Sequence, residues 1–114
     1  MKKKVRSEAE VKRQVMATLR GLAVMCFRMN AGRMMGQHKG KTWSVQLAPS
    51  GTADILAFVG KFPLWIETKR EGNVQSKDQI QFQRMVEGMG HHYIVARDSE
   101  AVAIAVNALR GFEQ

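Results

Sequence analysis

The chain has a single cysteine, Cys26, and no long run of apolar residues. One cysteine cannot form an intrachain disulfide, so a reducing, intracellular setting fits this composition. No apolar run approaches the ~20 residues that a membrane span requires. The N-terminal residues MKKKVRSEAEVKRQ have no apolar stretch behind their charges, so we expect no secretory signal. The sequence therefore predicts a cytoplasmic protein that does not span a membrane.

Acidic residues are missing from a long part of the chain, because none occurs from Val11 to Ala53. The 114 residues carry a formal net charge of +8. Such a basic segment favours a polyanionic partner, nucleic acid rather than an anionic membrane, although a merely solvated surface has the same composition. Residues 1–6 form a basic tail for phosphate contact, solvation or nuclear import. The side chains expected to contact nucleic acid are Lys12, Arg28, Arg33, Lys39 and Lys41.

Residues 1–114 are expected to form one α/β domain that begins with a helix. Ser7 to Glu10 has the pattern of a capping box, and an apolar stripe at helical spacing follows until about Gly21. The segment LAVMCFRM then reads as a buried strand. Residues Asn30 to Gly51 form a long basic connection, within which the alternating segment TWSVQL predicts a strand.

The second half of the chain alternates strands and helices. Strands are predicted at Asp54–Val59 and Leu64–Lys69, and at HHYIVA. Ser76 to Gln79 is a second capping box, and the last helix begins at Asp98 or Ser99. The second helix is expected to bury Phe82, Met85, Val86 and Met89. This order predicts a mixed central β-sheet flanked by helices.

Charged residues occupy both ends of the predicted hairpin GTADILAFVGKFPLWIETK. Adjacent strands lie about 4.8 Å apart, so pairing would bring Asp54 near Glu67. Two converging carboxylates repel each other, and a divalent cation would relieve that repulsion. Carboxylate oxygens suit Mg²⁺, and Lys69 would then be placed to neutralise charge that develops on a phosphate.

Two further polar residues precede inward-facing apolar positions. Glu8 lies three and seven residues before Val11 and Val15, so it can point toward the same site or simply complement the helix dipole. Gln79 precedes Phe82 by three residues, so its side chain can either point toward the site or complete its capping box. Joint metal binding by His91 and His92 is disfavoured, because neighbours on a strand point to opposite faces.

Five segments together resemble the VRR-NUC family of the PD-(D/E)xK nuclease superfamily. They are SEAEV, FRMNAG, GTADI, IETK and SKDQ, and the resemblance runs from about Ser7 to Leu109. Many relatives have proline before the aspartate, where this chain has Ala53. That proline is conformational rather than chemical, so the assignment of the aspartate is kept.

The resemblance implies a restriction-endonuclease-like αβββαβ core and Mg²⁺- or Mn²⁺-dependent hydrolysis of DNA, often branched or junction DNA. It implies that Asp54 and Glu67 are metal ligands, with the Thr68 carbonyl as a third and Glu8 as an outer ligand. Lys69 would be the catalytic lysine and Gln79 a site-shaping residue. Small members of the family are phage or prophage proteins that pair as homodimers, which implies a bacterial or phage-infected host cell.

Two functions of different class follow from these patterns. The first is a metal-dependent endonuclease that uses Asp54, Glu67 and Lys69. The second is a non-catalytic DNA-binding module that retains the nuclease fold and the basic surface. Trp43 and Trp65 can stack on unpaired bases, but burial in a core or an interface is expected for both.

Overall fold

A computed structural model of the chain describes residues 5–112, except for the side chains of Arg33 and Gln46. Three helices and six strands lie in this part of the chain. Their bounds are α1 (Glu8–Gly21), β1 (Met25–Arg28), β2 (Arg33–His38), β3 (Lys41–Gln46), β4 (Ile55–Val59), β5 (Phe62–Thr68), α2 (Lys77–Gly88), β6 (His92–Ala96) and α3 (Ser99–Gly111).

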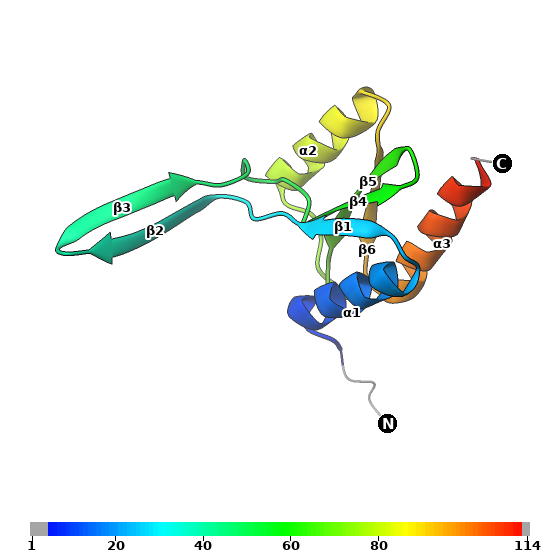
Figure 1. The fold of residues 1–114 in the computed structure, drawn as a ribbon, viewed down its shortest axis with the longest axis horizontal. Coiled ribbons are helices and arrows are strands. Elements are labelled where there is room, and N and C mark those ends of the chain that lie inside the picture. The colour runs from blue at the N-terminus through cyan, green and yellow to red at the C-terminus, as the bar shows by residue number, and fades with distance from the viewer. Residues whose placement is uncertain (1–4, 113–114) are drawn as a thin grey trace.

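Four of the strands form a mixed sheet in the order β1-β4-β5-β6 (Figure 1). β4 pairs antiparallel with both β1 and β5, whereas β6 runs parallel to β5. Helix α2 makes the crossover between the two parallel strands, which cannot be joined by a tight turn. The predicted α/β class, with a mixed sheet and flanking helices, is confirmed.

Each helix starts where its capping residue predicts. The Ser7 hydroxyl accepts a hydrogen bond from the Glu10 amide at the start of α1. Ser76 and Gln79 form the complete capping box of α2, and the Asp98 carboxylate caps α3. α1 ends at Gly21 and α2 at Gly88, as expected. Among residues 5–112, none of the helices combines the length and the apolar character of a membrane span.

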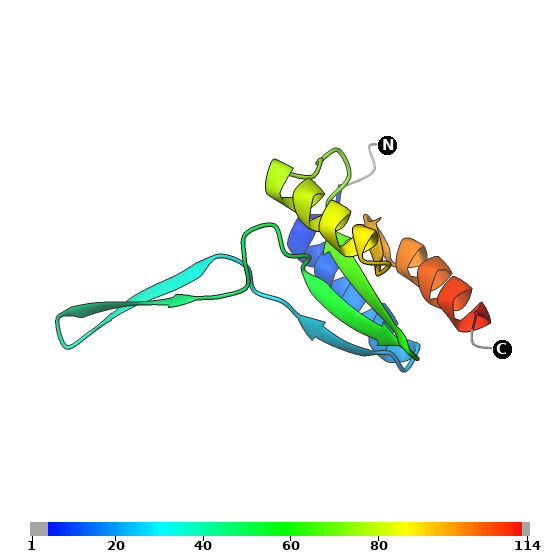
Figure 2. The same ribbon diagram turned by 90° about the horizontal axis from the view of Figure 1, so that it is seen from above.

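The helices cover the two faces of the sheet unequally (Figure 2). α1 and α3 pack together on one face, where they bury the larger apolar cluster. α2 covers the other face, where Val86 and Phe82 pack with Trp65 and Tyr93. The residues of the larger cluster include Val11, Val15, Leu19, Ile55, Ala57, Leu64, Ile66, Val102, Val106 and Leu109. Both faces of β5 are therefore covered, which explains why this strand is the most buried.

The expectation of a buried first strand is wrong. β1 is an edge strand of the sheet, and Met25 and Phe27 are exposed. Cys26 is half-buried, with its Sγ 4.0 Å from the Sδ of Met16. Burial raises the pKa of this thiol, although the nearby Arg20 opposes the shift. An apolar run predicts a strand, but whether that strand is central or at the edge depends on whether a further strand pairs with its free side.

The connection from Asn30 to Gly51 contains two strands instead of the single one expected. β2 and β3 form an antiparallel hairpin that pairs with no other strand among the described residues. It projects from the body as a long arm, to the left in Figure 1. The arm explains the elongated extents of 56 × 44 × 28 Å.

Fewer residues of α2 are buried than the sequence predicted. Val86 is buried and Phe82 is half-buried, but Met85 and Met89 are exposed. The reason is that α2 lies alone on its face of the sheet, so only a narrow part of its surface meets other residues. The basic tail is described from Val5 on, where the Arg6 guanidinium donates to the Gln14 side chain. The remaining tail residues, 1–4, lie outside the described part of the chain.

Candidate active site

Asp54 and Glu67 face each other at the open end of the β4–β5 hairpin. The register pairs Ile55 with Ile66, so Asp54 and Glu67 are the next pair beyond the last one. Their side chains lie close enough for each carboxyl group to change the pKa of the other. Glu67 is only 1% exposed, and its Oε2 has no hydrogen-bond partner among the described residues. The convergence predicted from the hairpin pattern is thus present in the fold.

Thr68 holds the Asp54 carboxylate in place. Its backbone amide and its Oγ1 both donate to Asp54 Oδ2, at 2.8 Å and 2.7 Å. Thr68 is fully buried, so these two bonds are shielded from water. The resemblance to the VRR-NUC family implied only the Thr68 carbonyl, as a third metal ligand. This orienting role of its amide and hydroxyl was not anticipated, because it depends on tertiary geometry.

The two carboxyl groups have opposite pKa shifts. Burial raises the pKa of Asp54, but the hydrogen bonds from Glu67 and Thr68, with the charge of Lys12, outweigh it and lower the pKa overall. Burial, the hydrogen bond to Asp54 and the Asp54 charge raise the pKa of Glu67 to about 9. At neutral pH Asp54 is therefore ionised, whereas Glu67 is protonated.

Two ion pairs connect the site to α1. Lys12 Nζ lies 3.4 Å from Asp54 Oδ1, and Lys69 Nζ lies 3.8 Å from Glu8 Oε1. Lys12, expected to contact nucleic acid, is therefore placed at the carboxylate pair itself. Glu8 was expected to point into the site, and it lies there through its ion pair with Lys69. Lys69 directly follows β5 and is only partly exposed, so its ammonium group is held at the sheet end.

Gln79 serves its capping box. Its side-chain oxygen accepts the Ser76 amide at 2.8 Å, and its own amide donates to the Ser76 hydroxyl at 3.2 Å. This is the structural alternative that the spacing left open. The structure thus commits the side-chain oxygen of Gln79 to the start of α2.

The donor set at the sheet end suits a hard divalent cation. Two converging carboxyl groups, one with a buried oxygen that has no hydrogen-bond partner among residues 5–112, have the character of a cation site. Mg²⁺ needs only one or two carboxylates when waters and substrate phosphate complete its shell. Within residues 5–112, no group of three or more His, Cys, Asp or Glu side chains is placed to hold a metal. Asp54 and Glu67 would therefore hold the ion as a pair of carboxylates.

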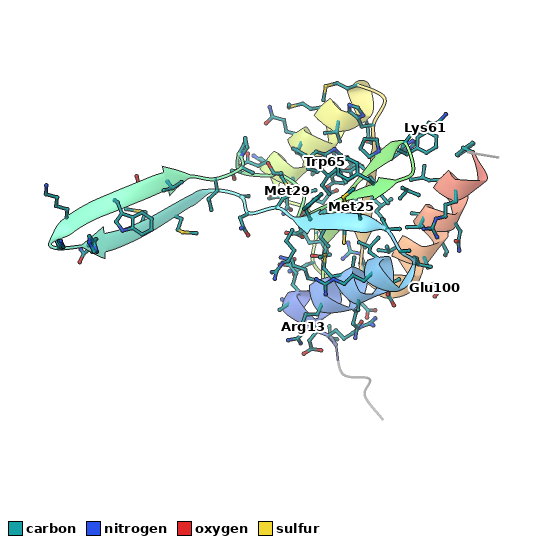
Figure 3. The ribbon with its side chains drawn as sticks, viewed as in Figure 1. Arg13, Met25, Met29, Lys61, Trp65 and Glu100 are labelled. Atoms are coloured by element: carbon teal, nitrogen blue, oxygen red, sulfur yellow. The ribbon has the colours of Figure 1, made fainter. Side chains whose placement is uncertain are left out.

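A cationic groove adjoins the carboxylate pair. It is a hollow of about 340 Å³ between α1 and β1 (Figure 3, where Arg13 and Met25 mark these elements). We define the groove by its lining residues, Ala9, Lys12, Arg13, Met16, Arg20 and Arg28. Arg28 is paired with Ile55, the residue after Asp54, so the groove lies beside the site. Two of the five predicted nucleic-acid contacts, Lys12 and Arg28, line it.

Arg13 and Arg20 line the groove although neither was among the predicted contacts. Their spacing of seven residues places them on one face of α1, near Lys12, so helical periodicity is a signal that identifies them. The other predicted contacts lie in the arm. Lys39 and Lys41 are exposed at its turn, and the side chain of Arg33 lies outside the described part of the structure.

No protein-family model, curated protein or solved structure matches this chain.

Proposed function

We propose that the chain is a metal-dependent nuclease that hydrolyses the phosphodiester bonds of DNA. The observation that carries this proposal is the carboxyl pair of buried Glu67 and partly exposed Asp54, at a sheet end beside two lysines. A purely structural pair would cost stability, since a buried carboxyl group without a full set of partners is unfavourable. A bound cation would offset this cost, because it would neutralise the charge of the two carboxyl groups.

The residues around the pair have distinct roles in the proposed reaction. Asp54, oriented by Thr68, and Glu67, once it has released its proton, would hold Mg²⁺ or Mn²⁺. A divalent cation held there supplies Lewis-acid polarisation of the scissile phosphate. The ammonium group of Lys69 stabilises the negative charge that develops on the phosphate oxygens. Glu8 keeps Lys69 turned toward the site through their ion pair.

The cationic groove supports DNA as the substrate. Lys12, Arg13, Arg20 and Arg28 bring four cations to one hollow beside the carboxylate pair. Phosphates that enter the groove would compete with Asp54 for Lys12, so substrate binding would free the Asp54 carboxylate. With the arm set aside, the element order α1, β1, β4, β5, α2, β6 is the αβββαβ order of the restriction-endonuclease-like core. This agreement supports membership of the VRR-NUC family, which we include in the proposal.

Cleavage of end-labelled DNA with Mg²⁺ or Mn²⁺ tests the proposal. Fully paired, tailed and branched DNA substrates, and an RNA strand, are incubated with the wild type and with Asp54→Asn. We expect cleavage that stops in a chelator and falls ~100-fold or more in Asp54→Asn. Glu87→Gln is the matched control, since Glu87 is an exposed acid on α2. Equal cleavage by Asp54→Asn and the wild type would refute the site.

A wild type that binds DNA but cuts none of these substrates with either metal would identify the chain as a non-catalytic DNA-binding module. Pairing of two chains is part of the proposal, because a cutter of junctions needs two sites that face opposed strands. The mass of the protein in solution, with and without branched DNA, measures this pairing. A monomer in both conditions would contradict it.

A further inference from the structure

The β2–β3 hairpin, which we call the arm, is a structural element without a core of its own. Backbone hydrogen bonds at its base join Gly32 to Ala48 and Leu47 to Gly32, so the two strands leave the body as one ribbon. A two-stranded hairpin alone in water is only marginally stable. Figures 1 and 2 agree that no helix or further strand covers the arm. A binding partner would give this arm a function.

One face of the arm is apolar toward its base and basic at its tip. The register places three pairs on this face: Met34 with Val45, Gly36 with Trp43, and His38 with Lys41. Met34, Trp43 and Val45 are each between 41% and 50% exposed. The opposite face carries mainly polar side chains, apart from Met35. The arm is therefore amphipathic, although no core of the described chain lies beneath its apolar face.

Trp43 lies across Gly36 on this face. A Cβ atom at Gly36 would lie 2.3 Å from Trp43 Cζ2, 2.6 Å from Cε2 and 3.0 Å from Nε1. The indole therefore occupies the space that any other residue at this position would fill. Because the ring rests on its own ribbon and remains 41% exposed, it presents an aromatic surface to an incoming ligand. The expectation that Trp43 is buried in a core is wrong, whereas its burial in an interface stays a prediction.

The charge of the arm decides which partner fits. Residues 30–50 contain Arg33, Lys39 and Lys41 and no acidic residue. A second copy of the chain carries a net charge of +8, so a basic arm would be repelled by it. A nucleic acid offers phosphates for the lysines and bases for the tryptophan, since aromatic side chains stack on any unpaired base.

We propose that the arm binds a nucleic-acid strand with unpaired bases, with Trp43 stacked on a base and with Lys39 and Lys41 on adjacent phosphates. The arm would thereby specify the substrate class of the proposed nuclease as DNA that contains a single-stranded segment, and its biological role rests on that proposed function. Inside a duplex both faces of each base are stacked on its neighbours, whereas the bases of a single-stranded tail can expose a face to the indole, so the arm would favour a tailed duplex over a blunt one.

Equilibrium binding of labelled DNA, measured by fluorescence anisotropy in the presence of a chelator, tests the arm separately from cleavage. The probes are a duplex with a single-stranded tail and a blunt duplex with the same paired sequence. Stacking is worth about 1–3 kcal/mol per base, so we expect Trp43→Ala to weaken binding of the tailed duplex by about 5- to 150-fold. Binding of the blunt duplex is expected to change by less than about twofold.

Two control variants separate stacking from folding of the arm. Trp43→Phe keeps an aromatic surface and is expected to recover most of the affinity for the tailed duplex. Met35→Ala removes an apolar side chain of 66% exposure from the opposite face and is expected to bind as the wild type does. Lys39→Ala combined with Lys41→Ala is expected to weaken both probes and to lower the salt dependence of binding.

Three results would overturn the proposal. The first is equal affinity of Trp43→Ala and the wild type for the tailed duplex. The second is an equal loss in Met35→Ala, which would show that only the fold of the arm matters. The third is a dimeric wild type that Trp43→Ala makes monomeric, which would assign the arm to a second copy. Because no metal is present, selective binding of the tailed duplex would survive a failure of the proposed cleavage.

Discussion

Asp54, directly before β4, converges on Glu67 of β5, and each carboxyl group changes the pKa of the other. Thr68 donates two hydrogen bonds to Asp54, whereas the Oε2 atom of Glu67 has no hydrogen-bond partner in the described part of the chain. The asymmetry sets the order of ionisation: Asp54 is charged first, and Glu67 keeps its proton until the pH is high. Several consequences of this arrangement are measurable.

The stability of the protein without metal should fall as the pH rises between 4.5 and about 9 because of Glu67. In this window the unfolded chain has released the Glu67 proton and the folded chain has kept it, so folding binds a proton. The loss approaches about 1.4 kcal/mol per pH unit at most. Glu67→Gln removes this dependence, so denaturant unfolding at pH 6 and pH 8 should show a growing advantage for the variant.

Glu71→Gln is the matched control for that measurement, because Glu71 is an exposed acid close to the site in the chain. It should follow the pH dependence of the wild type. A wild type and a Glu67→Gln variant with parallel stability between pH 6 and pH 8 would contradict the raised pKa of Glu67.

Metal binding should compete with the Glu67 proton. A cation at the carboxylate pair requires both groups to be ionised, so the affinity for Mg²⁺ should rise with pH, by up to about tenfold per unit below the pKa of Glu67. Thermal melts at pH 6.5 and pH 8.0 with a Mg²⁺ series measure this rise as a growing increase in Tm. Asp54→Asn should abolish the increase. If Mg²⁺ raises the Tm of Asp54→Asn as much as that of the wild type, the metal binds at another site.

Thr68→Val should weaken the site without a large change in shape. The variant loses the hydroxyl bond to Asp54 Oδ2 but keeps the backbone bond, at a cost of about 1 kcal/mol in the free energy of unfolding. The looser carboxylate should also weaken Mg²⁺ binding. Thr68→Ser restores the hydroxyl and should recover metal affinity. Equal metal affinity of Thr68→Ser and Thr68→Val would show that the Thr68 hydroxyl does not support metal binding.

The cationic groove should determine the salt dependence of DNA binding. Each phosphate contact contributes about one unit to the slope of log K against log salt, so Arg13→Ala and Arg20→Ala should each lower the slope by roughly that amount. Arg84→Ala is the matched control, because Arg84 lies exposed on α2, on the other face of the sheet. Equal slopes for the two groove variants and the control would show that DNA does not follow the groove.

Much of this site could be predicted because local rules act directly on its residues. Alternation along a hairpin brings Asp54 toward Glu67, and helical spacing puts Glu8 on the inward side of α1. The partner of Lys12 could not be predicted, since it depends on how closely α1 approaches the end of β4. The exposure of β1 and of Met85 also depends on neighbours from distant parts of the chain.

The arm shows the limit of sequence patterns most clearly. Alternation in TWSVQL predicted the strand β3, and it did so because side chains on a ribbon alternate whether or not a core lies beneath them. The same alternation made Trp43 look like a core residue. Only the three-dimensional arrangement shows that the apolar face of the ribbon is exposed and joins neither apolar cluster of the described residues.

Gly36→Ala should displace the Trp43 indole while the body of the protein stays folded. The new methyl group would lie 2.3 Å from Trp43 Cζ2, so the ring must move, and it can do so because the arm projects into solvent. In a Trp65→Phe background, emission from Trp43 should shift to longer wavelength as the ring becomes more exposed. The unfolding transition should stay close to that of the background protein. Gly88→Ala is the control for an added methyl group, because a Cβ atom at Gly88 of α2 would have open space and Gly88 has no positive φ. Unchanged emission in Gly36→Ala would show that the indole does not rest on Gly36 in solution.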